Sequence, residues 1–153
     1  MSTNPQAMSS SIARPAIART ALYLGALAVL ATGVVHIQQY YGQNYTTVPT
    51  IGTLFFLNFV AAVILTVGLI VPLRRVARRY ADAVRAVFAV GGIAFGVLSL
   101  VALFVSEQST LFGFQEHGYR MAIVLAIVAE AAATVFLAVY LAAEGKGDIR
   151  KVL

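Results

Sequence analysis

Four long apolar runs dominate the sequence and limit most strongly how it can fold. They lie at about residues 20–37, 51–73, 86–105 and 120–142. A helix needs about 20 apolar residues to cross the hydrocarbon layer of a bilayer, and its backbone groups are then hydrogen-bonded within the helix. We therefore predict an all-α bundle of four transmembrane helices. Such a chain is a multi-pass protein of the plasma membrane, and the lipid bilayer is its first partner.

The composition supports a membrane protein. Charged residues make up 11% of the chain and hydrophobic residues 60%, whereas a soluble domain usually carries about 25% charged residues. The net charge of +5 does not indicate nucleic-acid binding, because the basic residues flank the apolar runs. The chain contains no cysteine, which excludes disulfides, thiolate metal ligands and thiol catalysis.

The chain divides into one membrane domain and two tails. Residues 1–17 are rich in Ser, Ala, Asn, Gln and Pro, a composition typical of a disordered tail. Residues 18–143 form the membrane domain, and residues 144–153 form a second tail, with Gly145 and Gly147 marking the end of the last helix. Arg120 is the single basic residue on the side of the layer opposite to the others. The positive-inside rule therefore places both termini in the cytoplasm.

A cluster of arginines follows the second run at helical spacing. Its members are Arg74, Arg75, Arg78, Arg79 and Arg85. We expect a short amphipathic turn that lies on anionic lipid headgroups. The alternative to specific lipid recognition is that these charges only fix the topology.

One acidic residue lies deep inside the fourth run. Glu130 follows Arg120 by ten residues, which is about 15 Å along a helix that rises ~1.5 Å per residue. This position is near the centre of a hydrocarbon layer about 30 Å thick. An acid at that depth is protonated, paired with another group, or faces a wet cavity. Glu130 is thus either a ligand-binding carboxyl group or a structural acid that bonds to a neighbouring helix.

Other polar residues of the spans lie toward the same outer half of the layer. They are His36, Asn58, Thr32 and Ser99. If these side chains face inward, they form a small pocket that opens to the outside, with Glu130 at its floor. We expect three residues of the second outer loop at the mouth of this pocket: Glu107, Glu116 and His117. The alternatives are interhelical hydrogen bonds for Asn58, an interfacial position for His36 and a solvated loop for the mouth.

Small residues recur at intervals of three to four along the spans, and helices in lipid associate by close packing of such residues. The candidates for helix packing are Gly25, Gly92, Gly96 and Ala126. They favour close packing within the chain, and a homodimer is a second possibility. Three tyrosines of the first outer loop, Tyr40, Tyr41 and Tyr45, are expected to anchor the membrane interface. The alternative is that they stack on a ligand.

Several local patterns together suggest a resemblance. They are His36 near the end of the first span, the run from Pro49 to Phe56, the run from Leu111 to Glu116, and Glu130 in the fourth span. This combination resembles small four-span membrane proteins of unassigned function that are frequent in high-GC Gram-positive bacteria. The overall shape is also similar to the DoxX-like four-helix proteins. The resemblance covers about residues 20–142 and implies a fold, not a function.

Three functional hypotheses follow. The first is a non-enzymatic membrane protein whose pocket of Glu130, His36 and Asn58 binds a proton, a cation or a small amphiphile. The second is an accessory subunit or scaffold of a larger membrane complex. The third is a quinone-linked redox protein that uses the same pocket. The sequence has no nucleophile elbow, no phosphate-binding loop and no metal-ligand spacing, so we assign no catalytic residue, metal or cofactor.

Overall fold

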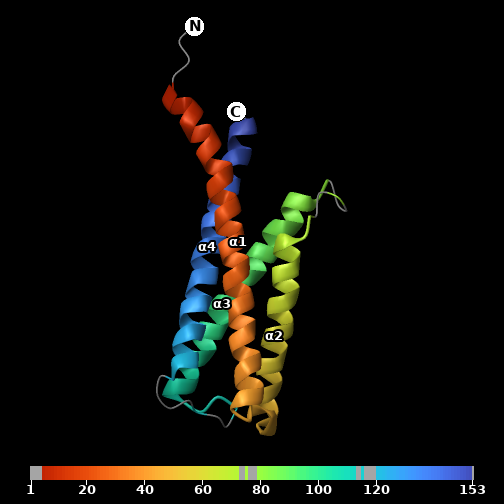
Figure 1. Cartoon of the computed structure of the whole chain (residues 1–153), viewed down its shortest axis with the longest axis vertical. Coiled ribbons are helices and arrows are strands. Elements are labelled where there is room, and N and C mark those ends of the chain that lie inside the picture. Colours follow the sequence, from red (N-terminus) through yellow and green to blue (C-terminus); the bar gives the residue numbers. More distant parts are fainter. Residues whose placement is uncertain (1–4, 73–74, 76–78, 113–114, 116–119, 153) are drawn as a thin grey trace.

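The computed structural model describes residues 5–72, 75, 79–112, 115 and 120–152, and for 5–14 and 146–152 it describes the backbone alone. These residues form four α-helices, α1 (Pro5–Gly42), α2 (Pro49–Ile70), α3 (Ala81–Gln108) and α4 (Met121–Val152), and the short 3₁₀ helix η1 (Tyr45–Thr47). Consecutive α-helices run in opposite directions (Figure 1). Both termini lie at the end of the bundle where α2 ends and α3 begins, which we call the arginine end. The opposite end carries η1, and we call it the η1 end.

Each α-helix contains a segment long and apolar enough to cross a membrane. The segments are Pro15–Gly42, Pro49–Ile70, Ala81–Gln108 and Met121–Gly145. The predicted all-α bundle of four helices is therefore confirmed, and the protein is a small multi-pass membrane protein. The cytoplasmic placement of the termini stays a prediction.

The helices extend beyond the apolar runs. α1 begins at Pro5, within the tail that the sequence predicts to be disordered, and α4 continues past Gly145 to Val152. Pro5 occupies the first helical position, where proline loses no helical hydrogen bond. A glycine inside a helix costs only about 1 kcal/mol, so Gly145 does not have to end α4. Pro15 lies inside α1, and the first turns of this helix lean away from the bundle (Figure 1).

α1 is the central helix, packed against both α2 and α4, while α3 packs mainly on α4. In the most apolar stretch of α1, half of the residues are buried, compared with 17% of the residues in the corresponding stretch of α3. Leu137 of α4 is fully buried in the core. A Cβ on Gly25 would lie 2.6 Å from Leu137 Cδ2, and one on Gly92 would lie 2.5 Å from Leu137 Cδ1. The two glycines thus let α1 and α3 approach Leu137 from two sides.

α2 and α3 meet near the arginine end and diverge from there. Gly68 of α2 packs against the ring of Phe88, and a Cβ on Gly91 of α3 would lie 3.0 Å from Leu65 Cδ2. Toward the η1 end the two helices separate (Figure 1).

Candidate functional site

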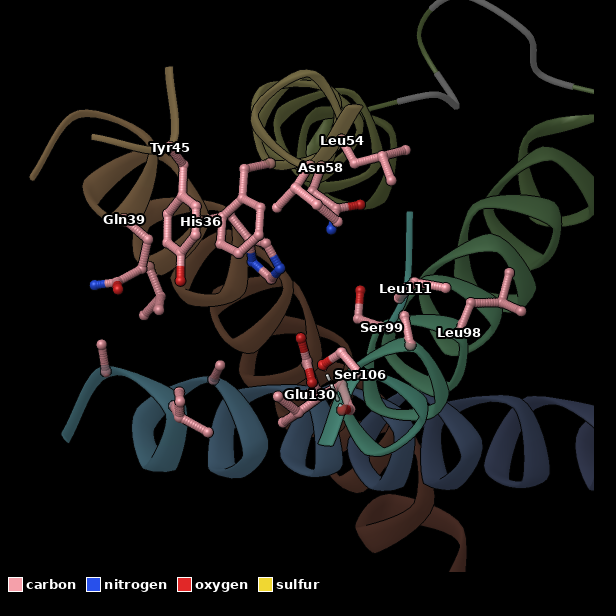
Figure 2. Close-up of a pocket in the computed structure, with 18 of the residues that line it drawn as sticks. His36, Gln39, Tyr45, Leu54, Asn58, Leu98, Ser99, Ser106, Leu111 and Glu130 are labelled. Atoms are coloured by element: carbon pink, nitrogen blue, oxygen red, sulfur yellow. Dashed lines mark hydrogen bonds between the residues drawn. The ribbon is translucent and has the colours of Figure 1, made fainter. Parts of the chain in front are cut away.

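A cavity of about 290 Å³ lies among the four helices in the half of the bundle nearest η1. Its wall is mainly apolar, with polar side chains from every helix (Figure 2). Of the residues singled out from the sequence, the cavity is lined by Glu130, His36, Asn58, Ser99 and Ala126. Four of the five residues expected to bind a ligand, Glu130, His36, Asn58 and Ser99, thus lie around one space, and we treat this cavity as the candidate site.

Glu130 is the most deeply buried polar residue of the cavity wall. Its side chain is 2% exposed, and its Oε2 has no hydrogen-bond partner within the part of the chain that the structure describes. Close contact between α3 and α4 holds its backbone: a Cβ on Gly96 would lie 2.9 Å from the Glu130 carbonyl oxygen. The Thr134 hydroxyl donates to that same oxygen at 2.9 Å. The carboxyl group points into the cavity (Figure 2).

The register of α1 and α4 brings Glu130 close to His36. Gly25 packs against Leu137; Thr32 lies seven residues after Gly25, and Glu130 lies seven residues before Leu137. Since the helices are antiparallel, Thr32 is level with Glu130, and His36 lies one turn nearer the η1 end. Helical side chains tilt toward the N-terminus of their own helix. Glu130 therefore leans toward the η1 end and His36 leans away from it, so that they approach each other.

A backbone carbonyl fixes the tautomer of His36. Its Nδ1 lies 2.8 Å from the Thr32 carbonyl oxygen, and because a carbonyl only accepts, Nδ1 must carry the proton. In the neutral ring, Nε2 then presents a lone pair. Phe55 packs on the ring with 5.0 Å between centroids. The cavity therefore contains two acceptors from different helices, His36 Nε2 and the Glu130 carboxyl group.

Thr32 does not line the cavity, which differs from the expectation. Its side chain is fully buried, and its hydroxyl donates to the Ala28 carbonyl oxygen at 3.2 Å within its own helix. At the level of Glu130, α4 covers this face of α1. Thr32 contributes to the site through its carbonyl group, which orients His36.

Tyr45 and Arg120 line the cavity at the η1 end; the sequence offered ligand stacking only as the alternative for Tyr45 and did not place Arg120 there. Tyr45 is 6% exposed and stacks on Phe55 at 4.8 Å, so it is not an exposed interfacial anchor. Arg120 Nη2 donates to the Tyr45 hydroxyl at 3.0 Å, and its Nη1 donates to Gln43 Oε1 at 3.0 Å. The sequence feature that could have indicated a turn here is Asn44, because asparagine adopts the left-handed conformation more readily than most residues. Asn44 has φ 57° and directly precedes Tyr45, the first residue of η1.

Two further polar residues of the lining, Gln39 and Ser106, were also missed. The Ser106 hydroxyl is occupied, because it donates to the Leu103 carbonyl oxygen at 2.7 Å. Glu107, expected at the mouth, is half-buried at the end of α3 and is not part of the lining. The other two expected mouth residues, Glu116 and His117, lie outside the described residues.

The residues expected to pack helices occupy two kinds of position. Gly25, Gly92 and Gly96 are buried in contacts between helices of the same chain. Ala126 instead faces the cavity. Gly92 and Gly96 therefore form no exposed surface that a second copy of the chain can use.

The arginines differ in their surroundings. Arg75 and Arg79 are exposed, and the Arg79 guanidinium lies 5.8 Å from the ring centroid of Tyr80. Arg85 lies inside α3, where it is partly buried and donates to the Val71 carbonyl oxygen at 3.1 Å, at the C-terminal end of α2. This bond links α2 to α3, and the contact of Arg85 with lipid headgroups stays a prediction. Arg74 and Arg78 lie outside the described residues.

Among the described residues, no three His, Cys, Asp or Glu side chains lie close enough together to hold a metal ion. Comparison of the chain with protein-family models gives no match, and comparisons with curated proteins and with solved structures give none either. No family is thus assigned, and the argument for function depends on the cavity itself.

Proposed function

We propose that this protein binds a small amphiphilic molecule in the cavity, with the polar head of the ligand bonded to Glu130 and His36. The observation that carries the proposal is the unpartnered Glu130 Oε2, which is buried and directed into a mainly apolar cavity. A buried polar atom without a partner costs about 1–3 kcal/mol. A ligand that donates a hydrogen bond to this oxygen recovers that cost.

The size and lining of the cavity favour an amphiphile over a lone proton or cation. The volume of about 290 Å³ is about ten times the ~30 Å³ that one water molecule occupies in the liquid. It is close to the lower bound of about 300 Å³ for small-molecule pockets. A hard cation such as Ca²⁺ needs about six to eight oxygen ligands, whereas the cavity wall is mainly apolar. The apolar wall instead matches a short hydrocarbon chain.

The polar atoms of the site favour a head group that donates hydrogen bonds. The Nδ1 proton of His36 is already bonded to Thr32, which leaves Nε2 as an acceptor in the neutral ring. The Glu130 carboxyl group accepts a hydrogen bond in either protonation state and also donates one when it is protonated, and the amide of Asn58 provides both a donor and an acceptor at the wall. A hydroxyl or amine head satisfies these atoms. We therefore choose a primary alcohol as the first probe.

The test uses the absence of tryptophan from the sequence. Phe95 lines the cavity, so Phe95→Trp gives a single fluorescent reporter in the wall. Added 11-bromoundecanol is expected to quench this reporter in a saturable way in detergent micelles. Glu130→Leu should weaken binding at least tenfold, and Glu130→Gln, which keeps one acceptor oxygen, should weaken it less.

The control for charge is Glu144→Leu, an exposed position on the same helix, which should leave binding unchanged. The control for partitioning is a reporter at Val101→Trp, which is 52% exposed on α3 and outside the lining. That reporter should show only non-saturable quenching. Equal affinities for the parent reporter protein and Glu130→Leu would disprove the proposal.

The quinone-linked alternative would use the same cavity. A quinone head only accepts hydrogen bonds, so the Asn58 amide or a protonated Glu130 would have to donate to it, and the head itself would give no donor to His36 Nε2. An absorption spectrum of the purified protein in oxidised and reduced buffer tests this alternative directly.

A further inference from the structure

We infer that the ligand reaches the cavity sideways from the lipid layer, through an opening between α2 and α3. This inference rests on the proposed function and specifies the class of ligand, which is a single-chain amphiphile dissolved in the membrane. The opening is bordered by Leu54 of α2 and by Leu98 and Ala102 of α3, and we call these three residues the portal.

The portal residues face the cavity and the outside of the bundle at once. All three line the cavity. Leu54 is also 39% exposed, Leu98 is 67% exposed, and Ala102 is exposed. A side chain that lines a cavity and is also exposed on the outside of the bundle lies at the edge of an opening in the cavity wall. Figure 2 shows Leu54 and Leu98 on the two helices that border this side of the site, with the side chain of Leu111 drawn between them in this view.

The register of α2 and α3 places the portal residues opposite one another. Leu65 packs toward Gly91 near the arginine end. Leu54 lies eleven residues before Leu65, and Ala102 lies eleven residues after Gly91, so the antiparallel helices bring them to one level. Near the arginine end the glycines allow contact, but at the portal the helices have diverged. The side chains there are exposed instead of packed across the interface.

The portal lies within the membrane-spanning segments. Leu98 precedes the end of its segment at Gln108 by ten residues, which is about 15 Å along the helix at ~1.5 Å per residue. Half of a hydrocarbon layer is also about 15 Å thick. Leu54 follows the start of its segment at Pro49 by five residues, and Ala102 precedes Gln108 by six. The portal therefore extends from about 8 to about 15 Å inside the segment ends at ~1.5 Å per residue, and it faces lipid chains over that depth.

Among the described residues, Tyr45 and Arg120 obstruct the route from the η1 end. Tyr45 covers that end and stacks on Phe55. Arg120 donates to the Tyr45 hydroxyl and to Gln43 Oε1, and so connects the start of α4 to the chain around η1. A ligand that arrived from the aqueous side at Tyr45 would have to disrupt this stacking and these bonds. A ligand that arrives through the portal disrupts neither.

The consequence for the ligand is a defined orientation. The polar head reaches Glu130 and His36 inside the bundle, while the chain leaves between Leu54 and Leu98 into the surrounding lipid. A water-soluble molecule without a chain gains nothing from this arrangement. A chain longer than the cavity is accommodated, because its end remains in the bilayer.

The experiment measures how fast the probe associates in phosphatidylcholine vesicles. Stopped-flow quenching of the Phe95→Trp reporter by 11-bromoundecanol is followed at several ratios of lipid to protein. The association rate should follow the mole fraction of alcohol in the lipid and not its concentration in water. Ala102→Phe should slow association at least tenfold, and Leu54→Phe provides the same test from the opposite helix if the first variant does not fold.

The matched control is Val101→Phe, next to Ala102 but outside the lining and 52% exposed. It should leave the rate unchanged. If the reporter binds the alcohol through Glu130 but neither portal variant slows association, the portal is wrong and the proposed function stands. If the reporter shows no saturable binding at all, the proposed function fails and the portal fails with it.

Discussion

At the scale of single residues, Glu130 is the side chain with the least local justification. It lies in the middle of an apolar helix, it is 2% exposed, and one of its carboxyl oxygens has no partner among the described residues. Natural proteins keep such groups where function needs them, and removal of the group often increases stability. A structural acid behaves in the opposite way, because its loss breaks bonds that hold the fold.

This contrast gives a stability prediction for Glu130→Leu. Leucine is apolar and slightly larger than glutamate, and the adjacent cavity has room for it. The substitution removes an unsatisfied buried oxygen that costs about 1–3 kcal/mol. We expect thermal unfolding in detergent to occur at the same temperature as in the wild type or at a higher one. The comparison is Thr66→Val, which removes the bond from the Thr66 hydroxyl to the Ala26 carbonyl oxygen between α2 and α1. That variant should lose about 1 kcal/mol. A larger loss in Glu130→Leu than in Thr66→Val would show that Glu130 is structural.

At the scale of helices, the contact between α3 and α4 positions Glu130, and Gly96 makes it possible. A Cβ at this position would lie 2.9 Å from both the Glu130 carbonyl oxygen and Thr134 Oγ1. The backbone oxygen cannot rotate away, so Gly96→Ala must separate the helices. We expect a loss of about 1–3 kcal/mol, typical of overpacking, measured by unfolding in sodium dodecyl sulfate and monitored by circular dichroism.

The matched control for Gly96→Ala is Gly91→Ala on the same helix. A Cβ there would lie 3.0 Å from Leu65 Cδ2, the end of a flexible side chain. This variant should lose little stability, because the leucine can change rotamer. If both variants were equally stable, close packing of Gly96 against Glu130 would not hold the helix pair together.

Helix periodicity predicted the site only in part. His36, Asn58, Ser99 and Glu130 were found because each lies in an apolar run where a polar residue is costly. Tyr45 was missed because a left-handed residue and a 3₁₀ turn place it, and neither has a repeating signal. Arg120 was missed because its place depends on its bond to the Tyr45 hydroxyl, 75 residues away in the chain. Thr32 lies four residues before His36 and so on the same face of α1. Whether α4 covers that face at Thr32 depends on how the two helices are aligned along their axes. Hydropathy contains no information about that alignment.

The boundaries of the helices were less predictable than their existence for a related reason. Apolar runs indicate which residues lie in the hydrocarbon layer. A helix continues beyond the layer until its backbone N–H and C=O groups form hydrogen bonds other than those within the helix. α3 begins at Ala81, five residues before the apolar run that starts near residue 86. As a result Arg85 is a helix residue that bonds to the end of α2, not a member of a loop.

At the scale of the whole molecule, the position of the cavity and the distribution of charge are linked. The cavity lies toward the η1 end, and the exposed Arg75 and Arg79 lie at the arginine end. If the positive-inside rule applies, the arginine end is cytoplasmic, and the cavity lies in the outer half of the membrane. The portal would then collect amphiphiles from the outer leaflet.

Single cysteines test this orientation, because the natural sequence has none. Thr47→Cys lies in η1 and Tyr80→Cys lies at the arginine end, and both positions are exposed. A membrane-impermeant maleimide should label Thr47→Cys in intact cells and Tyr80→Cys only after the membrane is permeabilised. Val90→Cys, 56% exposed within the spanning segment of α3, should stay unlabelled in both conditions because lipid surrounds it. Labelling of Tyr80→Cys in intact cells would reverse the orientation and place the portal in the inner leaflet, where it would meet a different population of lipids.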